Sequence, residues 1–260
     1  MTSALTVAGS DSGGGAGIQA DLKTFAAHGV FGLSAVTAVT AQNSVGITGI
    51  HAVPALVVAK QIEAVVSDFE VSAAKTGMLL SAEIIEAVAA SIETLAVPHL
   101  VVDPVMTSTS GDLLLADEAV EALKTELVRR ASVVTPNRPE AERLTGRPIT
   151  SLSETRDAAR RIHDMGPRAV IITGGHGPCS DVVDVFYDGH DLIEFGAPRI
   201  ETSHSHGTGC TFSAAVAAEL ALRRTFADAT QRAKSYVEQC LRHPLGIGHG
   251  SGPLDHFWRE

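Results

Sequence analysis

Short apolar runs rich in β-branched residues recur along the chain, separated by longer alanine-rich stretches. The runs cover residues 5–8, 33–39, 100–102, 132–134 and 169–172. They are apolar along their length and do not alternate with polar residues, as is typical of strands in a parallel sheet covered on both faces. We therefore expect them to form one mostly parallel central sheet.

The stretches between these runs have helical patterns. Helices are expected over residues 18–28, 54–68, 82–95, 117–128 and 154–164, and two more over residues 207–224 and 226–241. Strands that alternate with helices predict βαβ units, with helices on both faces of the sheet. The expected fold class is α/β, a three-layer αβα sandwich with a mostly parallel central sheet.

A hairpin is expected where Asp188 and Gly189 separate two further apolar runs, residues 182–187 and 192–195. An Asp-Gly pair between such runs is a strong signal for a tight hairpin turn. No internal repeat, low-complexity tract or linker-like segment interrupts the pattern. We expect a single domain over residues 1–260.

The composition argues against several classes of protein. Hydrophobic residues make up 45% of the 260 residues and charged residues 19%, which is a globular composition. The net charge of -10 argues against a nucleic-acid partner, because proteins that hold phosphate backbones are usually basic. No apolar stretch of about 18 residues is present, so no membrane partner is expected. The start of the chain lacks a signal-peptide pattern, and the sparse, odd set of cysteines favours the cytoplasm: Cys179, Cys210 and Cys240.

The first chemical motif is a glycine-rich segment, residues 9–17, between an expected strand and an expected helix. A Walker A loop would continue with Lys-Ser or Lys-Thr, and neither follows. A dinucleotide-binding loop could begin at Gly15, but no acidic residue stands about twenty positions later to hold the ribose. Two interpretations stay open: a substrate-binding loop with Asp21 facing inward, or a plain tight turn with Asp21 in solvent.

The second motif ends in Gly207, Thr208, Gly209 and Cys210, immediately before an alanine-rich helix. The glycines leave backbone N–H groups accessible, and the first turn of a helix adds unpaired N–H groups and a positive dipole end. This combination predicts an anion hole for the γ-phosphoryl group of a nucleotide. A thiol at a helix N-terminus typically has a pKa lowered to about 3.5–7.5, so Cys210 could accept the proton of an attacking hydroxyl. The alternative is a small buried cysteine packed against the sheet.

Polar side chains follow two of the expected strands. Asn137 and Glu140 come shortly after residues 132–134, and Asp103 directly follows residues 100–102. Oxygen-bearing side chains at the carboxyl ends of parallel strands fit a Mg²⁺–phosphate site, because Mg²⁺ prefers oxygen ligands. Asn137 can also cap a helix that has Glu140 in its first turn, and the two roles can hold together.

Taken together, these segments resemble the hydroxymethylpyrimidine and phosphomethylpyrimidine kinases of the ribokinase superfamily. The matching stretches are residues 8–25, 37–43, 75–79, 102–106, 135–141, 174–176, 206–210 and 250–256. The resemblance runs through nearly the whole chain in the right order. Cys210 is its most telling residue, because most of the superfamily has Asp there as the catalytic base.

The resemblance implies an enzyme that uses ATP and Mg²⁺ to phosphorylate 4-amino-5-hydroxymethyl-2-methylpyrimidine and then its monophosphate, in thiamin biosynthesis. Gln42 would hydrogen-bond the pyrimidine, since an amide offers both a donor and an acceptor. The other residues implied to line this pocket are Gly9, Asp21, Met78 and Val105. For Met78 and Val105 the alternative is core packing. Members of the family also tend to form homodimers.

Thr173 departs from the family pattern, which usually has Lys at this position near the nucleotide phosphates. The Thr hydroxyl can still donate one hydrogen bond there. A pyridoxal kinase of the same superfamily is the nearest alternative, since it performs the same chemistry on a different ring alcohol. A non-catalytic relative that binds the pyrimidine is a more distant one.

Overall fold

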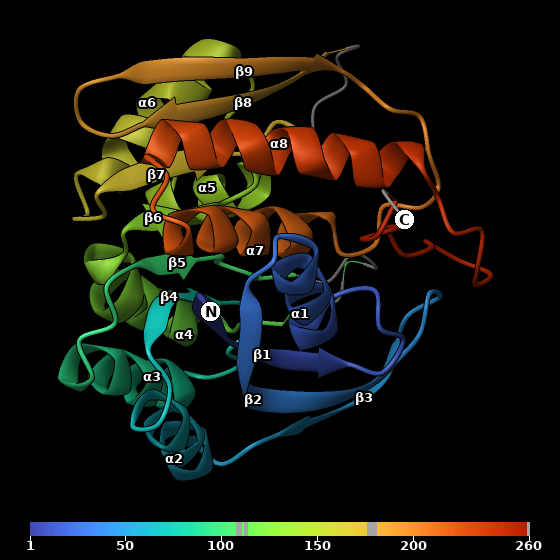
Figure 1. Ribbon diagram of the computed structural model, residues 1–260. Helices are drawn as coiled ribbons and strands as arrows, with labels where there is room; N and C mark the ends of the chain where they lie inside the picture. The colour runs from blue at the N-terminus through green and yellow to red at the C-terminus, as the bar shows by residue number, and fades with distance from the viewer. Residues whose placement is uncertain (108–110, 112–113, 176–180, 259–260) are drawn as a thin grey trace.

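The computed structural model describes residues 1–107, 111, 114–175 and 181–258. These residues form a nine-stranded sheet in the order β3-β2-β1-β4-β5-β6-β7-β8-β9 (Figure 1). Strands β2, β1, β4, β5, β6 and β7 are parallel, whereas β3, β8 and β9 pair antiparallel with their neighbours. The strands are β1 (Ser3–Asp11), β2 (Phe31–Gln42), β3 (Ile47–Ala52), β4 (Val71–Thr76), β5 (Leu100–Val102), β6 (Val133–Val134), β7 (Ala169–Ile172), β8 (Asp181–Tyr187) and β9 (Leu192–Pro198).

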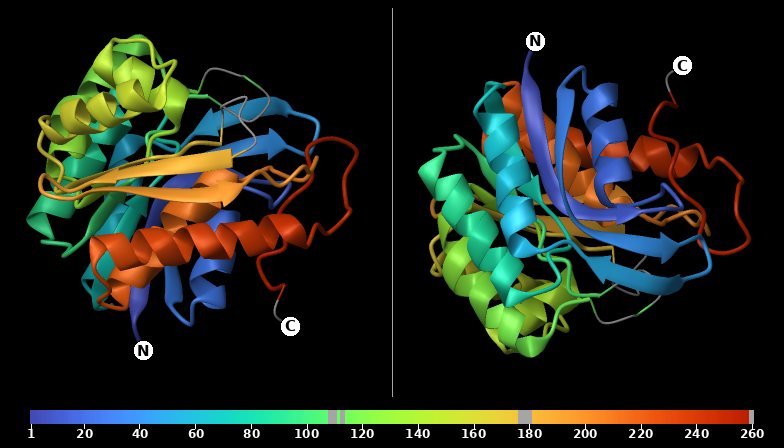
Figure 2. Two further views of the ribbon diagram at one scale, coloured as in Figure 1. Left: turned by 90° about the horizontal axis from the view of Figure 1, so that it is seen from above. Right: turned by 90° about the horizontal axis from the view of Figure 1, so that it is seen from below.

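Helices cover both faces of the sheet, so the expected αβα sandwich is confirmed (Figures 1 and 2). One layer consists of α1 (Gly17–Ala27), α7 (Thr208–Ala221) and α8 (Phe226–Arg242). The opposite layer consists of α2 (Ala55–Val66), α3 (Ala82–Thr94), α4 (Asp117–Ala122), α5 (Arg138–Thr145) and α6 (Leu152–His163). Helix α7 lies against the middle of the sheet and is almost wholly buried, which its small side chains allow.

The alternation of side chains along the strands directs polar groups toward α7. Ala73 and Val101 belong to the core beneath α1, α7 and α8. Because side chains two positions apart point to the same face of a strand, Lys75 and Asp103 also lie on this face. The carboxyl ends of the central strands therefore deliver charged groups to the start of α7.

The structure adds two strands that the hydrophobic pattern did not predict, β3 and β4. β3 is an edge strand that is exposed along nearly all of its length. The segment expected as one helix over residues 117–128 is helical as far as Arg130, but only its first part is an α-helix. It consists of α4, a π-helical turn (Leu123–Leu127) and a 3₁₀ turn (Val128–Arg130).

Within the described part of the chain, no helix is both long and apolar enough to span a bilayer. The expectation of one domain over residues 1–260 stays a prediction, and it is supported by the single sheet to which all the described strands belong. Two residues of the sequence analysis, His176 and Cys179, lie outside the described residues.

Candidate active site

A cavity of about 550 Å³ opens at the carboxyl ends of the parallel strands. It runs across the sheet from Gln42 at the end of β2 to Val182 on β8, with the first turn of α7 between them. Ligands of open α/β sheets bind at this edge. Every residue that the sequence analysis assigned to a site, except Asp21, lines this one cavity.

The first turn of α7 forms the centre of the cavity. Gly207 is the N-cap and has a left-handed backbone with φ of 85°. A Cβ atom at this position would lie 1.8 Å from the carbonyl oxygen of Gly15, so the two glycine-rich segments pack backbone against backbone. No side chain caps the helix, and the amides of Gly209 and Cys210 belong to the turn whose N–H groups lack partners inside the helix. This geometry suits an anion.

Cys210 lies in the first turn of α7 and lines the cavity, as expected, but its ionisation differs from the expectation. Burial raises the pKa of the thiol to about 12. The charge of Lys75 and a hydrogen bond from the backbone N–H of Gly17 act in the opposite direction, but they do not offset the burial. The predicted lowering of the Cys210 pKa is therefore wrong for the free site, where the thiol keeps its proton at neutral pH.

Lys75 on β4 is fully buried and forms part of the cavity wall. Its Nζ donates to both carboxylate oxygens of Asp21, each at 3.0 Å, and lies 3.8 Å from Oδ2 of Asp103. Burial alone would lower the pKa of Lys75, but the charges of Asp21 and Asp103 and the hydrogen bond to Asp21 act with that of Cys210 to outweigh it, so the pKa is raised and the ammonium stays charged. A permanent positive charge is thus fixed beside Cys210.

Asp21 on α1 is completely buried, and Lys75 separates it from the cavity. Its Oδ2 also accepts a hydrogen bond from Thr6 Oγ1 at 2.6 Å. The implied direct contact between Asp21 and a ligand is corrected accordingly, because both carboxylate oxygens are already engaged. Asp21 acts on the cavity through the lysine that it orients.

Asp103, at the end of β5, does face the cavity. Its Oδ2 accepts a hydrogen bond from Ser213 Oγ on α7 at 2.8 Å, which ties the strand to the helix. Burial raises the pKa of Asp103, and the nearby Lys75 opposes this shift.

Asn137 and Glu140 form a capping box at the start of α5. Asn137 Oδ1 accepts from the Glu140 N–H, and Glu140 Oε2 accepts from the Asn137 N–H, each at 2.9 Å. Glu140 is nevertheless on the cavity wall. Burial, and then the charge of Asp103, raise the pKa of Glu140 to about 8. The capping role and a place in the cavity therefore coexist.

The surroundings of Asp103 and Glu140 favour a cation. Thr135, at the end of β6, lines the cavity, and its buried Oγ1 has no hydrogen-bond partner among the described residues. Two buried carboxylates with raised pKa values, one of which raises that of the other, are next to an unpartnered hydroxyl and form a set of oxygen donors suited to Mg²⁺. In the ranges that the structure describes, no cluster of three His, Cys, Asp or Glu side chains could hold a metal ion by itself.

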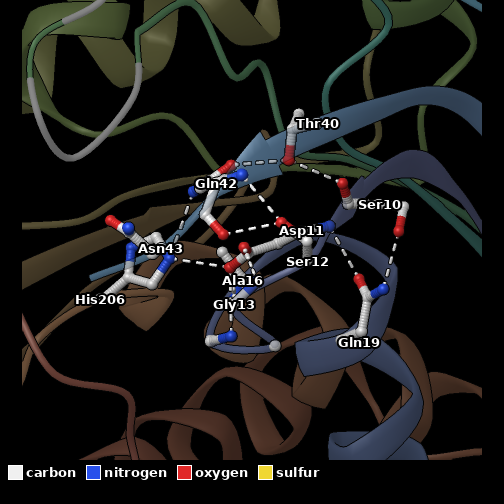
Figure 3. A network of polar contacts seen from close by, with 12 residues as sticks. Ser10, Asp11, Ser12, Gly13, Ala16, Gln19, Thr40, Gln42, Asn43 and His206 are labelled. Atoms are coloured by element: carbon white, nitrogen blue, oxygen red, sulfur yellow. Dashed lines mark hydrogen bonds and ion pairs between the residues drawn. The ribbon is translucent and has the colours of Figure 1, made fainter. Parts of the chain in front are cut away.

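The first glycine-rich segment is organised by Asp11 (Figure 3). Its carboxylate accepts hydrogen bonds from the backbone N–H groups of Gly13, Gly15 and Ala16, and Oδ2 lies 2.9 Å from Nε2 of His206. Burial would raise the pKa of Asp11, but the hydrogen bonds from His206 and the backbone lower it below its usual value. Asp11 thus holds the loop that carries Gly15 against the loop before α7.

Gln42 lies at the β2 end of the cavity, where its side chain joins the same network (Figure 3). Its Oε1 accepts from Thr40 Oγ1 at 3.1 Å, and its Nε2 lies 3.3 Å from Nε2 of His206. Its main chain exchanges two hydrogen bonds with the hydroxyl of Ser12, at 2.7 and 2.8 Å. These contacts hold the amide at the cavity wall, where it can meet a ring edge.

The remaining residues of the implied pocket also line the cavity: Gly9, Met78 and Val105. A Cβ atom at Gly9 would lie 2.3 Å from Cε of Met78, so glycine makes room for that side chain. Thr37 Oγ1 donates to the Met78 carbonyl at 2.6 Å and fixes its backbone.

Thr173 follows β7 on the β8 side of the cavity, next to Asn137. Its N–H donates to the Pro136 carbonyl at 2.9 Å. The position at which this chain has Thr, where the family usually has Lys, is therefore part of the cavity wall.

Three residues of this site had no predicted role: Lys75, Asp11 and His206. All three stand in stretches that carry the family resemblance. Lys75 also offered a direct signal, since a lone lysine at the end of an apolar strand on the carboxyl edge of a sheet is unusual.

Known proteins share this architecture. A family model described as phosphomethylpyrimidine kinase matches residues 11–255. The chain is 48% identical to the hydroxymethylpyrimidine/phosphomethylpyrimidine kinase of Bacillus subtilis (strain 168), over 98% of this chain and 94% of that protein.

Solved structures of related kinases have the same fold as this chain. The phosphomethylpyrimidine kinase from Clostridium difficile 630 has a TM-score of 0.83 and 39% identity, covering 92% of this chain and 99% of the other. An ADP complex of Bacillus subtilis pyridoxal kinase has a TM-score of 0.91 and 37% identity, covering 98% and 97%.

Proposed function

Because the chain belongs to the phosphomethylpyrimidine kinase family, we propose that it transfers the γ-phosphoryl group of ATP to the hydroxymethyl group of 4-amino-5-hydroxymethyl-2-methylpyrimidine. It then phosphorylates the monophosphate to the diphosphate, as part of thiamin biosynthesis. The observation that carries this proposal is the single cavity in which Gln42 and the first turn of α7 face the same space.

The β2 end of the cavity binds the pyrimidine. Gln42 presents a donor and an acceptor to the aminopyrimidine edge, while Met78 and Val105 supply apolar surface for the ring. The hydroxymethyl group then points along the cavity toward the start of α7.

The β8 end binds the nucleotide. Val182, Val237 and Leu241 line it with apolar surface suited to a flat base. From there a triphosphate reaches the amides of Gly209 and Cys210, which stabilise the negative charge on the transferred group. The two substrates thus approach the same helix terminus from opposite sides.

Cys210 is the proposed acceptor of the hydroxyl proton, because its thiol lies in this first turn beside the fixed charge of Lys75. With a pKa of about 12, the thiolate is a minor form at neutral pH, and its share grows as the pH rises. Phosphoryl transfer is largely dissociative, so positioning and electrostatics supply most of the acceleration.

Asp103, Asn137 and Glu140 are the residues proposed to hold Mg²⁺, together with the hydroxyl of Thr135. When bound, the ion offsets the charge of the nucleotide phosphates. Since Mg²⁺ usually keeps several waters, a protein site of few carboxylates is sufficient.

The test is a steady-state assay with ATP and Mg²⁺ on the hydroxymethylpyrimidine, in which mono- and diphosphate products are followed separately. Conversion through to the diphosphate is expected. A protein that binds the pyrimidine but turns over no ATP would instead be the non-catalytic relative. In that case Thr173→Lys would be the first variant to assay for a gain of activity.

Pyridoxal kinase activity is the second candidate, because the pyridoxal kinase from Bacillus subtilis has the same fold with a TM-score of 0.91. Pyridoxal is therefore assayed in parallel. Turnover of pyridoxal alone would assign the chain to that reaction.

We further propose that the enzyme works as a cytoplasmic homodimer. The edge of the sheet formed by β2 and β3 exposes apolar side chains, with Val39 52% and Ile50 43% exposed. Light scattering after size-exclusion chromatography should give twice the mass of one chain, and Ile50→Asp should shift it toward the monomer. A wild-type monomer would contradict the proposal.

A further inference from the structure

A second buried ion pair lies at the β8 end of the cavity, away from Lys75. Lys234 on α8 donates from Nζ to Oδ2 of Asp184 on β8 at 2.9 Å, and the two side chains are only 6% and 7% exposed. Both residues line the cavity. The mechanism described above uses neither of them.

The ion pair is also hydrogen-bonded to the loop that follows β7. Asp184 Oδ1 accepts from the backbone N–H of Gly174 at 2.8 Å. A Cβ atom at Gly174 would lie 2.2 Å from the Val183 carbonyl oxygen, so the loop backbone rests directly on β8. One carboxylate thus joins α8, β8 and the loop.

The loop itself is part of the cavity wall, which Thr173 and Gly175 both line. It is held on its other side by the bond from the Thr173 N–H to the Pro136 carbonyl at 2.9 Å, beside Asn137. Asp184 therefore holds the β8 side of a loop that adjoins the proposed phosphate and metal groups, where Arg199 also donates to the Gly175 carbonyl at 3.1 Å.

Fold stability alone does not account for this pair. Removing two charges from water costs about as much as their attraction returns, so apolar residues of the same size often stabilise a protein equally well. What apolar residues cannot do is accept the Gly174 hydrogen bond. Lys234 keeps the acceptor oriented through its own hydrogen bond to Oδ2, and it also donates to the Val182 carbonyl oxygen at 3.4 Å.

We propose that Asp184 and Lys234 are positioning residues that fix the loop of residues 173–175 for binding of the nucleotide. The inference rests on the proposed function, because it takes the β8 end as the nucleotide end of the cavity. The hydrogen bond from Gly174 to Asp184 sets the nucleotide affinity, and the pyrimidine end is independent of it.

Two double variants separate positioning from stability. D184N/K234M removes both charges but keeps a side-chain oxygen that accepts from Gly174. D184L/K234M removes both charges and the acceptor with little change of volume. Because neither variant leaves a buried charge unpaired, both should fold with similar midpoints of thermal unfolding.

The expected result is a rise of about tenfold in KM for ATP and in Kd for ADP in D184L/K234M, and a change below about threefold in D184N/K234M. The KM for the pyrimidine should stay within about twofold in both. Equal nucleotide affinities in the two variants would overturn the inference, as would an equal loss at both substrates. D184A/K234M repeats the comparison with a smaller side chain in case D184L/K234M does not fold.

Glu219→Gln is the matched control, since Glu219 is a buried carboxylate on α7 that does not line the cavity. It should leave the KM for ATP within about twofold of wild type. Calorimetric titration with ADP needs no turnover, so it tests the loop even if the pyrimidine proves not to be the substrate. If the proposed function is wrong, the wild-type protein does not phosphorylate the pyrimidine. If this inference is wrong, the two double variants have equal affinities for the nucleotide.

Discussion

The thiol of Cys210 carries the sharpest prediction at the scale of single residues. With a pKa of about 12, its thiolate fraction rises tenfold for each pH unit across the alkaline range. We therefore expect kcat/KM for the pyrimidine to rise with pH between about 8 and 10. Cys210→Ala should slow turnover by about 10²–10⁴-fold, remove this rise, and leave pyrimidine binding nearly intact in a calorimetric titration.

Cys240→Ala supplies the control for that experiment, because Cys240 is a buried cysteine on α8 outside the cavity. It should keep the wild-type pH profile. If the alkaline rise survived in Cys210→Ala, the proton would leave by another route and the base assignment would be wrong.

Lys75 carries the second residue-scale prediction. Lys75→Met leaves the buried carboxylates of Asp21 and Asp103 without their cation, so it should lower the free energy of unfolding by about 3–5 kcal/mol. Lys124→Met breaks an ion pair with the exposed Glu121 and should cost at most about 1 kcal/mol. Urea unfolding of both variants measures the difference, and equal losses would contradict the role given to Lys75.

At the scale of elements, the start of α7 depends on one backbone conformation. Gly207→Ala puts a Cβ into the Gly15 carbonyl oxygen and strains a residue with φ of 85°, at a cost of about 1–3 kcal/mol or more. Turnover should fall by at least about tenfold because the first-turn amides shift. Gly196→Ala on β9, where a Cβ would have open space, should leave turnover and the unfolding midpoint nearly unchanged. Similar turnover in the two variants would refute this account.

Whether a strand could be predicted from the sequence depended on its burial and on how apolar its residues are. β5 and β7 are short apolar strands buried on both faces, so their pattern identified them. β3 was missed because its side chains are exposed and no apolar run marks it. β4 was missed because it combines alanines with a lysine, a residue that normally stays in water.

The residues of the candidate active site also differ in whether the sequence could predict them. The local motifs around Cys210 and Asn137 located the cavity, because glycines and caps act over a few residues. The pairs that complete it join distant positions: Lys75 and Asp21 are 54 residues apart, and His206 and Asp11 are 195 apart. The pKa of Cys210 could not be foreseen either, because burial by the assembled fold sets it and the helix terminus does not.

At the scale of the whole molecule, stability should depend on pH in a defined window. Glu140 has its pKa raised to about 8 in the folded state, so the folded protein holds this proton more tightly than the unfolded chain does. The stability from Glu140 is present below pH 4.5 and is lost as the pH rises through 8. Asp103 shifts in the same direction.

The pH window for this measurement is 6.5–8.5. His256 has a pKa lowered to about 4 from 6.5, so its contribution to stability rises with pH and levels off above 6.5, and it cannot cause a fall across this window. The unfolding midpoint of the metal-free protein should fall across this window, and Glu140→Gln should flatten the fall. Added Mg²⁺ should raise the midpoint most at the alkaline end. A profile unchanged by Glu140→Gln would show that another group carries the dependence.

The enclosure of Lys75 has a consequence for chemical labelling. Acylating reagents attack only the neutral, accessible form of an amine, and the Lys75 ammonium is both protonated and fully buried under α1 and α7. Lys75 can therefore be acylated only after these helices separate from the sheet, whereas the exposed Lys60 on helix α2 is acylated in the folded protein. The ratio of acylated Lys75 to acylated Lys60, followed by mass spectrometry over time, would therefore report how fast the fold opens.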